Sequence, residues 1–425
     1  MRRVAITGIG LLSALGNGVQ PTWQQLVHGK TAVGPIKGFD ASALHSQLGA
    51  EILDFDPLQY VSNKRSLRMM TRNDQLAVAG AVLAVNDSGA NPSDWDPEKV
   101  GLFVGSNKEI SNPSSLLDGT LVARNDDGSV DWHRLGEGAS AFYPLFYVEG
   151  LQAASLFYIS SVYGLKGANT YFAGTAESSA TAIGRAFRAV RRGEAEVALA
   201  GGFDDATSWW NMTKYDALGL MTDRNELGAA ACRPYDLDRS GTVMGEGSVV
   251  LLLEEFQSAL RRNARIYAEI TGFGVGFDAY KLLTPHPEGR GLSSAVEAAL
   301  READTLPASV AYVATHGNGT VLGDVSETRA IGATFGDAVD GLVASSVTAA
   351  TGYMVAAAGA LNVAVGALAL HHQTAPPMLN LTNPDPACEL DWVSGDAREL
   401  RFDQALALAR GLDGQNVALT MRAAR

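Results

Sequence analysis

The sequence is poor in cysteine, proline and positive charge, and each deficit excludes a class of protein. Its 425 residues include two cysteines, Cys232 and Cys388, which lie too far apart in the chain to build a disulfide framework or a zinc site. Only 15 prolines occur, and no polar low-complexity run is present, which argues against long disorder. The formal net charge of -13 excludes the broad basic face that nucleic acid or an anionic membrane needs, although a local basic patch could still serve an acidic partner.

Motifs for cofactors and metals are also missing. Gly8-Ile9-Gly10 follows a strand pattern, but Ser13 stands at the third glycine position of a dinucleotide fingerprint, so we expect a structural turn here. No phosphate loop with a GK[ST] end occurs. His371-His372 has no companion cluster, and adjacent side chains point in different directions, so this pair is expected at a helix end. We therefore expect neither a cofactor nor a metal.

No segment has the pattern of a membrane span. The start, MRRVAITGIGLLSALG, places two arginines before an apolar run, as a signal peptide does. Its run contains three glycines and leads directly into strand and turn patterns, so we interpret it as a buried first strand. Every other apolar stretch is interrupted by polar residues or glycines before it reaches a spanning length. These patterns, with so few cysteines, predict a protein of the cytoplasm.

Strand and helix patterns alternate from one end of the chain to the other, which predicts an α/β fold with sheets covered by helices on both sides. The segment 106–150 is poorer in pattern and is interpreted as an excursion. The segment 354–370 is apolar all round, which predicts a helix in the centre of the molecule. Strands are expected at 4–7, 100–105, 196–202, 247–254, 266–276 and 309–317, and helices at 72–89, from 182 to 192, 254–264, 292–304 and 354–370.

One feature looks repeated. A crowded turn of small residues opens a helix at 175–184 and again at 350–360. Two α/β halves, each with a central helix, would explain the repeat, and the sequence alone leaves that duplication open. Without a Gly/Pro-rich linker between them, we expect one compact unit with halves at 1–255, including the excursion at about 106–160, and 256–425.

The first turn, TAESSATAIG, places Glu177 at the position where an active-site turn would carry its reactive residue. A carboxylate at a helix N-terminus is stabilised by the helix dipole by ~0.3–1 kcal/mol, so Glu177 could serve stability alone. As a base or nucleophile it would need a partner. His316, at a strand-to-loop junction, is the only plausible partner. One such residue is too few for a complete catalytic mechanism.

Seven separated stretches together resemble the β-ketoacyl synthase family of the thiolase fold, in order along the whole chain. They are VAITGIGLLSALGNG (4–18), GANTYFAGTAESSATAIGRAFRAVRRGEAEVALAGG (167–202), RPYDLDRSGTVMGEGSVVLLLE (233–254), HGNGTVLGDVSE (316–327), SVTAATGYMVAAAGALN (346–362), PPMLNLTNPDPACELDWV (376–393) and GLDGQNVALT (411–420). The resemblance implies a five-layered αβαβα fold from two duplicated βαβαβαββ halves, a dimer formed through strands of both subunits, and acyl chains carried on acyl carrier protein. It also implies a cysteine nucleophile at a helix N-terminus and two histidines that polarise a malonyl thioester.

The chain departs from the family where the chemistry lies. Glu177 occupies the cysteine position, and Thr348 and Tyr353 stand where the lysine and the second histidine belong. Only His316 remains. A carboxylate would form a mixed anhydride in place of a thioester, so we expect no catalytic residues and no condensing activity. The gating loop is also changed, because Leu412-Asp413 replaces Phe-Gly within Gly411, Leu412, Asp413 and Gly414.

One branch of the family is similar in having such losses: the chain-length factors, or ketosynthase β subunits, of type II polyketide synthases, which usually have glutamine at the cysteine position. The resemblance implies a heterodimer with an active ketosynthase α subunit, a shared polyketide tunnel and an acyl carrier protein as partner. Alternatives are a malonyl-carrier-protein decarboxylase using His316 and Glu177, a purely structural ketosynthase partner, and a homodimeric pseudoenzyme. Aromatic residues before the elbow are expected to line the tunnel or to pack at the interface: Phe142, Tyr143, Phe146, Tyr147, Phe157 and Tyr158.

Overall fold

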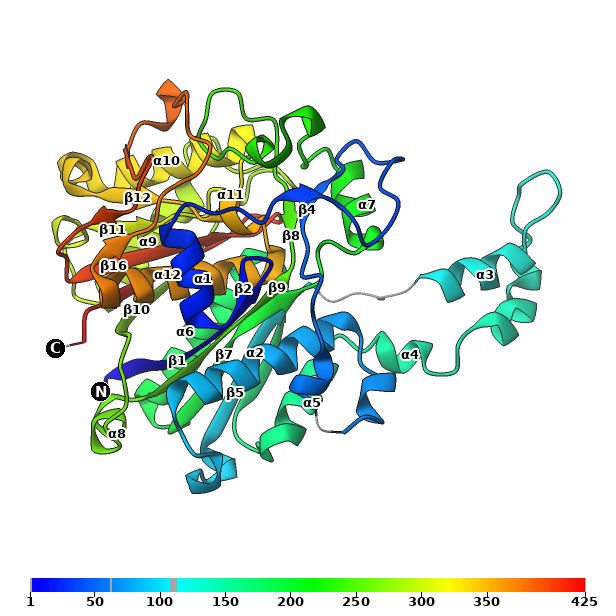
Figure 1. Cartoon of the computed structure of the whole chain (residues 1–425), viewed down its shortest axis with the longest axis horizontal. Coiled ribbons are helices and arrows are strands. Elements are labelled where there is room, and N and C mark those ends of the chain that lie inside the picture. Colours follow the sequence, from blue (N-terminus) through cyan, green and yellow to red (C-terminus); the bar gives the residue numbers. More distant parts are fainter. Residues whose placement is uncertain (1, 62, 108–112, 425) are drawn as a thin grey trace.

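The computed structural model describes residues 2–61, 63–107 and 113–424, and it confirms the α/β alternation (Figure 1). The strands of the main sheet are β1 (Val4–Ser13), β2 (Gly16–Asn17), β5 (Val100–Ser106), β6 (Asn169–Ala173), β7 (Val197–Asp204), β9 (Gly247–Glu255), β10 (Ala268–Phe277), β11 (Tyr312–Ala314), β12 (Val343–Ser345), β14 (Asp391–Trp392), β16 (Gln404–Arg410) and β17 (Gln415–Arg422). The helices are α1 (Val19–Val27), α2 (Arg72–Ser88), α3 (Ser114–Val122), α4 (Phe146–Glu149), α5 (Ala154–Tyr163), α6 (Ala176–Arg192), α7 (Trp209–Ala217), α8 (Phe256–Arg261), α9 (Arg290–Glu302), α10 (Val321–Phe335), α11 (Thr348–Thr351) and α12 (Ala358–His372). Smaller sheets join β3 (Gly34–Pro35), β4 (Leu48–Ala50) and β8 (Met244–Gly245), and β13 (Thr374–Ala375) with β15 (Arg398–Glu399).

Strand pairing repeats itself in the two halves of the main sheet. In the first half, β5 runs parallel to β6 and β7, while β9 is antiparallel to both β7 and β1. In the second half, β11 runs parallel to β12 and β16, while β17 is antiparallel to both β16 and β10. The same order in both halves resolves the duplication that the sequence left open. Antiparallel pairing of β1 with β10 joins the half-sheets into one hydrogen-bonded sheet.

The layers follow from where the helices pack. The central helices α6 and α12 contact each other and strands of both half-sheets, whereas α2 covers the outer face of the first half-sheet and α9 that of the second (Figure 1). This gives the five-layered thiolase-like arrangement. The apolar segment Val355–His372, the one helical stretch among the described residues that is long and apolar enough to cross a membrane, is 89% buried inside this fold. Its apolar surface is thus used in packing between the half-sheets.

Gly8 and Gly10 do not form the expected turn, because both lie inside the ten-residue strand β1. A Cβ on Gly10 would lie 1.9 Å from the carbonyl oxygen of Gly80 in α2. The equivalent glycine in the second half, Gly274, would bring its Cβ to 1.9 Å from the carbonyl oxygen of Ala295 in α9. The glycines therefore allow a helix backbone to lie directly on the strand. This role depends on a helix from a distant part of the chain, so the local sequence pattern could not predict it.

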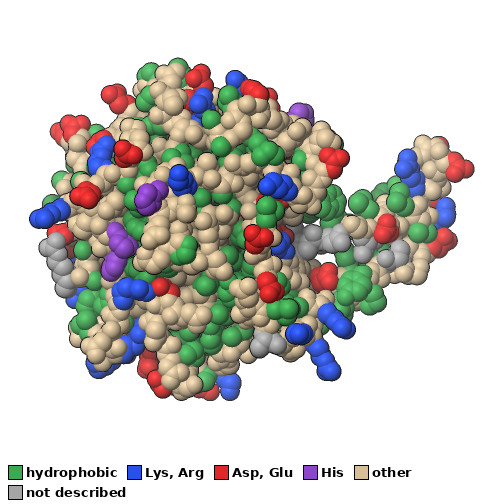
Figure 2. All heavy atoms as spheres, viewed as in Figure 1, with side chains coloured by type: hydrophobic (Ala, Val, Ile, Leu, Met, Phe, Trp, Pro, Cys, Tyr) green, Lys and Arg blue, Asp and Glu red, His purple; other side chains and the backbone are tan. Residues whose placement is uncertain are grey.

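Between β5 and β6 the chain leaves the body as an arm that carries α3, the 3-10 segment η5 (Trp132–Ala141) and α4, on the right of Figure 1. Hydrophobic side chains gather along this arm in Figure 2, and Trp132 and Tyr147 are 74% and 75% exposed. The chain returns through α5 to β6, the last strand of the sheet, where Asn169, Thr170 and Ala173 are exposed. An unpaired strand edge beside an apolar arm is a surface that suits a partner chain.

Candidate functional site

Glu177 lies in the first turn of α6, two residues after the N-cap Thr175. Its carboxylate accepts hydrogen bonds from the Thr175 backbone N–H, at 2.9 Å, and from the Thr175 hydroxyl, at 2.7 Å. The residue is 2% exposed, and this burial raises the pKa of the carboxyl to about 7 against the lowering effect of the two bonds. The hydrogen bonds to the Glu177 carboxylate thus come from Thr175, and a pairing of Glu177 with His316 stays a prediction.

The loop at 411–414, which the resemblance implies to be the gating loop, lies directly over this carboxylate. A Cβ on Gly411 would lie 2.6 Å from Glu177 Oε2 and 2.8 Å from Asp413 Oδ1. On the other side, a Cβ on Gly174 would lie 2.0 Å from Glu177 Oε1. Only glycine fits at these two positions while Glu177 keeps its place. The nearby charge of Asp413 adds to burial in raising the Glu177 pKa.

His316 follows β11 and is held through its backbone. The N–H groups of His316 and Gly317 donate to the Glu327 carboxylate at 2.7 and 2.9 Å, and the Tyr235 hydroxyl donates to the same group at 2.9 Å. Burial, and then the positive charge of Arg410, lower the pKa of His316 to about 3. The imidazole is therefore neutral at physiological pH, and its Nδ1 has no hydrogen-bond partner within the described part of the chain.

Tyr353 and Thr348 complete the surroundings of His316. The ring of Tyr353 meets the His316 ring edge-on, with 5.5 Å between centroids. Its buried hydroxyl finds no hydrogen-bond partner in the regions that the structure describes, and burial together with the charge of Glu177 raises its pKa. The Thr348 hydroxyl donates to the carbonyl oxygen of His316 at 3.5 Å. The structure thus brings all four degenerate positions of the sequence prediction together.

A cavity of 260 Å³ opens toward these groups from the surface. Leu412 of the gating loop and the neighbouring Leu283 share its wall, and the Leu283 N–H donates to the Leu412 carbonyl at 3.1 Å. Mostly apolar walls with a few polar groups suit an extended ligand that carries amides or hydroxyls. The polar lining residues are Ser240, Thr284, His316, Asn318, Thr320 and Arg410.

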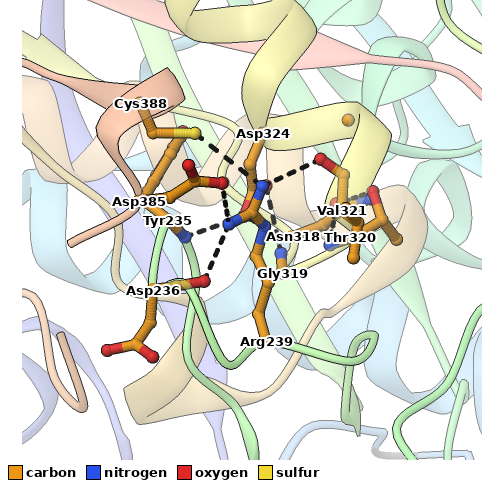
Figure 3. A network of polar contacts seen from close by, with 12 residues as sticks. Tyr235, Asp236, Arg239, Asn318, Gly319, Thr320, Val321, Asp324, Asp385 and Cys388 are labelled. Carbon is orange, nitrogen blue, oxygen red and sulfur yellow. Dashed lines mark hydrogen bonds and ion pairs between the residues drawn. The ribbon is translucent and has the colours of Figure 1, made fainter. Parts of the chain in front are cut away.

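A buried ion-pair network fixes the loop that carries His316 (Figure 3). The Arg239 guanidinium lies 3.3 Å from Asp324 and donates to Asp385 at 2.8 Å, with its side chain 1% exposed. Asp324 in turn accepts from the backbone N–H groups of Tyr235, at 2.8 Å, and Gly319, at 3.2 Å. Burial raises the pKa of Asp324 to about 7, opposed by Arg239. The sequence analysis did not single out these residues, although charges inside otherwise apolar motifs are the signal that could have found them.

Arg410 is a second functional side chain that sequence reasoning missed. It lies at the end of β16, where the gating loop begins, and is 6% exposed. Its guanidinium donates to Asn416 at 2.9 Å and to the Gly323 carbonyl at 3.1 Å, and it lies 3.3 Å from Asp278. The base of the gating loop is thereby tied to the start of α10 and the end of β10. An arginine that closes the apolar run QALALA was its only signal.

The aromatic residues predicted to line a tunnel or an interface lie away from the 260 Å³ cavity and form none of its walls. Tyr143 and Tyr147 on the arm and Phe157 on α5 are 43%, 75% and 67% exposed. Phe142 is half-buried, Phe146 is buried against it with ring centroids 5.5 Å apart, and the buried Tyr158 donates to the Met69 carbonyl at 3.0 Å. The two roles proposed for these residues stay predictions.

Comparison with known proteins identifies the family. The model for the β-ketoacyl synthase N-terminal domain matches residues 1–259, and that for the C-terminal domain matches residues 267–382. A 3-oxoacyl-[acyl-carrier-protein] synthase 2 from Coxiella burnetii is 36% identical over 420 residues, covering 99% of this chain and 98% of that protein. The ishigamide ketosynthase/chain length factor superposes with a TM-score of 0.88 at 28% identity. The AntDE:AntF complex, a type II acyl carrier protein with its ketosynthase bound to a hexaketide, superposes with a TM-score of 0.87 at 25% identity. Both comparisons cover 100% of each chain. With its fold, its half-for-half duplication and these matches, the chain belongs to the β-ketoacyl synthase family.

Proposed function

We propose that this chain is a chain-length factor, the subunit of a type II polyketide synthase that pairs with an active ketosynthase and shapes the tunnel for the growing chain. One observation carries the proposal. Thr348 and Tyr353 contact His316 where the resemblance implies a lysine and a second histidine, and Glu177 faces Tyr353 from the implied cysteine position. The frame of a condensing site is kept, but its nucleophile position holds the carboxylate of Glu177, which cannot carry an acyl group as a thioester.

The surface features support a heterodimer. The exposed edge of β6 and the apolar arm lie at one end of the sheet, and the side chain of Tyr147 on the arm is 75% exposed. Side chains on a projecting arm can reach a tunnel only where another chain lies beside them. We therefore assign Tyr143, Tyr147 and Phe157 to the contact with a ketosynthase α subunit.

An acyl carrier protein fits the remaining features. The 260 Å³ cavity, with amide and hydroxyl groups in its wall, suits the flexible arm on which a carrier holds its acyl chain. Lys64, Arg65 and Arg68 are exposed within five residues of one another, so this acidic chain has a local basic patch. We assign that patch to an acidic carrier protein, in the cytoplasm.

Product length in the reconstituted pair tests the proposal. The chain is co-expressed with a ketosynthase α subunit, and the polyketides formed with malonyl carrier protein are sized by mass spectrometry. Alanine replacements of Tyr143, Tyr147 and Phe157 are expected to change product length while the pair still co-purifies. Leu306→Ala, at a 73% exposed leucine outside the arm, is the matched control. If every variant gave products of unchanged length, the chain would be a purely structural partner.

A malonyl-carrier decarboxylase is the second candidate, and one observation favours it. Since the pKa of Glu177 is raised to about 7, part of the population carries a neutral carboxyl that faces Tyr353, whose ring contacts the neutral His316. Carbon dioxide release from malonyl carrier protein by the purified chain, lost in Glu177→Ala, would support this role. Glu177→Gln then separates the effects of charge and shape, because the two side chains are nearly isosteric.

A further inference from the structure

Two carboxylates flank one backbone atom of the gating loop. Glu177 Oε2 and Asp413 Oδ1 lie 2.6 and 2.8 Å from the single point where a Cβ on Gly411 would stand. The distance between the two oxygens therefore cannot exceed the sum of these two values. Glu177 is 2% exposed on α6, whereas Asp413 is exposed on the loop. Like charges this close repel each other strongly when one of them is buried.

No cation neutralises this pair within the described residues. The bonds of Glu177 come from Thr175, and that of Asp413 comes from the Gln415 side-chain amide at 3.1 Å. Arg410 precedes the loop, but its guanidinium is committed to Asp278, Asn416 and the Gly323 carbonyl. The pair thus gives the loop a net negative charge that the rest of the site does not balance.

The two carboxylates flank the loop that forms one wall of the cavity. Gly411 and Leu412 line the 260 Å³ cavity together with His316, and Glu177 lies directly beneath Gly411. An acyl group that enters this cavity and approaches His316 passes along the loop that both carboxylates flank. A neutral acyl group would meet little resistance, whereas the free carboxylate of a malonyl thioester would be repelled.

We propose that Glu177 and Asp413 form a charge filter, which makes the pocket of this chain reject dicarboxylic acyl thioesters such as malonyl carrier and admit thioesters of uncharged acyl groups. The filter rests on the proposed function, in which a partner ketosynthase is present. The malonyl group then binds to that partner, and this subunit contacts neutral acyl chains only. The filter also argues against the decarboxylase role, which requires a malonyl group in this pocket.

The groups that face Glu177 set how the filter depends on pH. Asp413 faces it from the loop, Tyr353 from the segment before η9 (Val355–Ala357), and Asp204 on β7 lies near Tyr353. His316, on the far side of Tyr353, stays neutral because its pKa is lowered to about 3, and the raised pKa of Tyr353 keeps the phenol neutral. The Glu177 carboxyl, with a pKa of about 7, is then the group that changes charge between pH 6 and pH 8.

The experiment compares two probes on the purified full chain: the non-hydrolysable amide analogues of acetyl-pantetheine and malonyl-pantetheine, measured by calorimetry at pH 6 and pH 8. At pH 8 the acetyl probe should bind at least about tenfold more tightly than the malonyl probe. This ratio should fall at pH 6. In the double variant Glu177→Gln/Asp413→Asn it should come within about twofold of unity at both pH values. Glu297→Gln, at an exposed glutamate of α9, should leave the ratio unchanged.

Equal affinities in the unaltered chain, a ratio that survives the double substitution, or failure to bind either probe would each overturn the filter. None of these outcomes bears on product length in the reconstituted pair. A failed length test, conversely, leaves the binding ratio as it was measured. The two proposals can therefore fail separately.

Discussion

Tyr353 meets His316 edge-on at 5.5 Å, in the place where the family resemblance implies a second histidine. Both rings are buried, and both are neutral at physiological pH, because the pKa of the phenol is raised and that of the imidazole is lowered. A neutral phenol can donate one hydrogen bond, but it does not exchange protons near pH 7 as a histidine does. The proposed loss of condensing chemistry therefore rests on Tyr353 as well as on Glu177.

Restoring the thiol alone should restore acylation but not condensation. In Glu177→Cys the new thiol would lie at the N-terminus of α6, where the helix dipole lowers its pKa. We expect mass spectrometry to detect one acyl group after incubation with acyl carrier substrates, and no elongated product, because Thr348 and Tyr353 remain.

The unaltered chain is the control for this experiment. Its two cysteines are buried, and burial raises the pKa of Cys232 to about 12 and that of Cys388 to about 11. Neither should acylate. Elongation by Glu177→Cys alone would mean that Tyr353 can replace a histidine, and acylation of the unaltered chain would contradict the assignment of a lost nucleophile.

Glu177 should make folding stability depend on pH. Its folded-state pKa of about 7 lies above the ordinary value of 4.5, so the folded chain keeps this proton where the unfolded chain has released it. This contribution to stability is fully present below pH 4.5 and is lost as pH rises to about 7, with a total of about 3 kcal/mol. Glu177→Gln removes it, so the variant should gain about 3 kcal/mol relative to the unaltered chain between pH 4.5 and pH 8.

Urea unfolding at pH 4.5 and pH 8 measures this gain. The quantity to compare is the difference in unfolding free energy between the unaltered chain and Glu177→Gln. Asp205 and Asp324 also have raised pKa values, but they contribute equally to the pH dependence of both chains. A stability difference that stays constant with pH would show that the pKa of Glu177 is the same in the folded and unfolded chains, and that burial does not raise it.

The sequence predicted the frame of this molecule better than its interior charges. Local periodicity located α2, α6 and α12, because apolar spacing and caps such as Gly193 are local signals. It misplaced Gly8 and Gly10, whose role depends on a helix from a distant part of the chain. Glu177 was found by its position before a helix, but its Thr175 partner and the Asp413 repulsion depend on side-chain geometry and on a loop 236 positions away.

Arg239 should be essential for stability. Arg239→Met leaves the buried carboxylate of Asp324 and the partly exposed one of Asp385 without their cation, which should cost about 3–5 kcal/mol at pH 8. In acid the cost should shrink, because Asp324 then takes up a proton. Arg261→Met is the matched control: that side chain is 72% exposed and lies 3.9 Å from Glu255, so the change should stay within about 0.5 kcal/mol. Equal losses in both variants would mean that the buried network adds no more than a surface pair.

The arm should be needed for pairing rather than for folding. Tyr147→Glu puts a charge on a side chain that is 75% exposed in the single chain, so circular dichroism and thermal unfolding should not change. At an interface the same charge must be desolvated, and the affinity for a ketosynthase α subunit should fall at least about tenfold. Leu306→Glu, at 73% exposure between α9 and β11, should have no effect on pairing. Sedimentation velocity with and without the α subunit distinguishes the outcomes. If the two substitutions weakened pairing equally, the arm would not belong to the interface. If the unaltered chain associated with itself and Tyr147→Glu abolished this association, the chain would be a homodimeric pseudoenzyme.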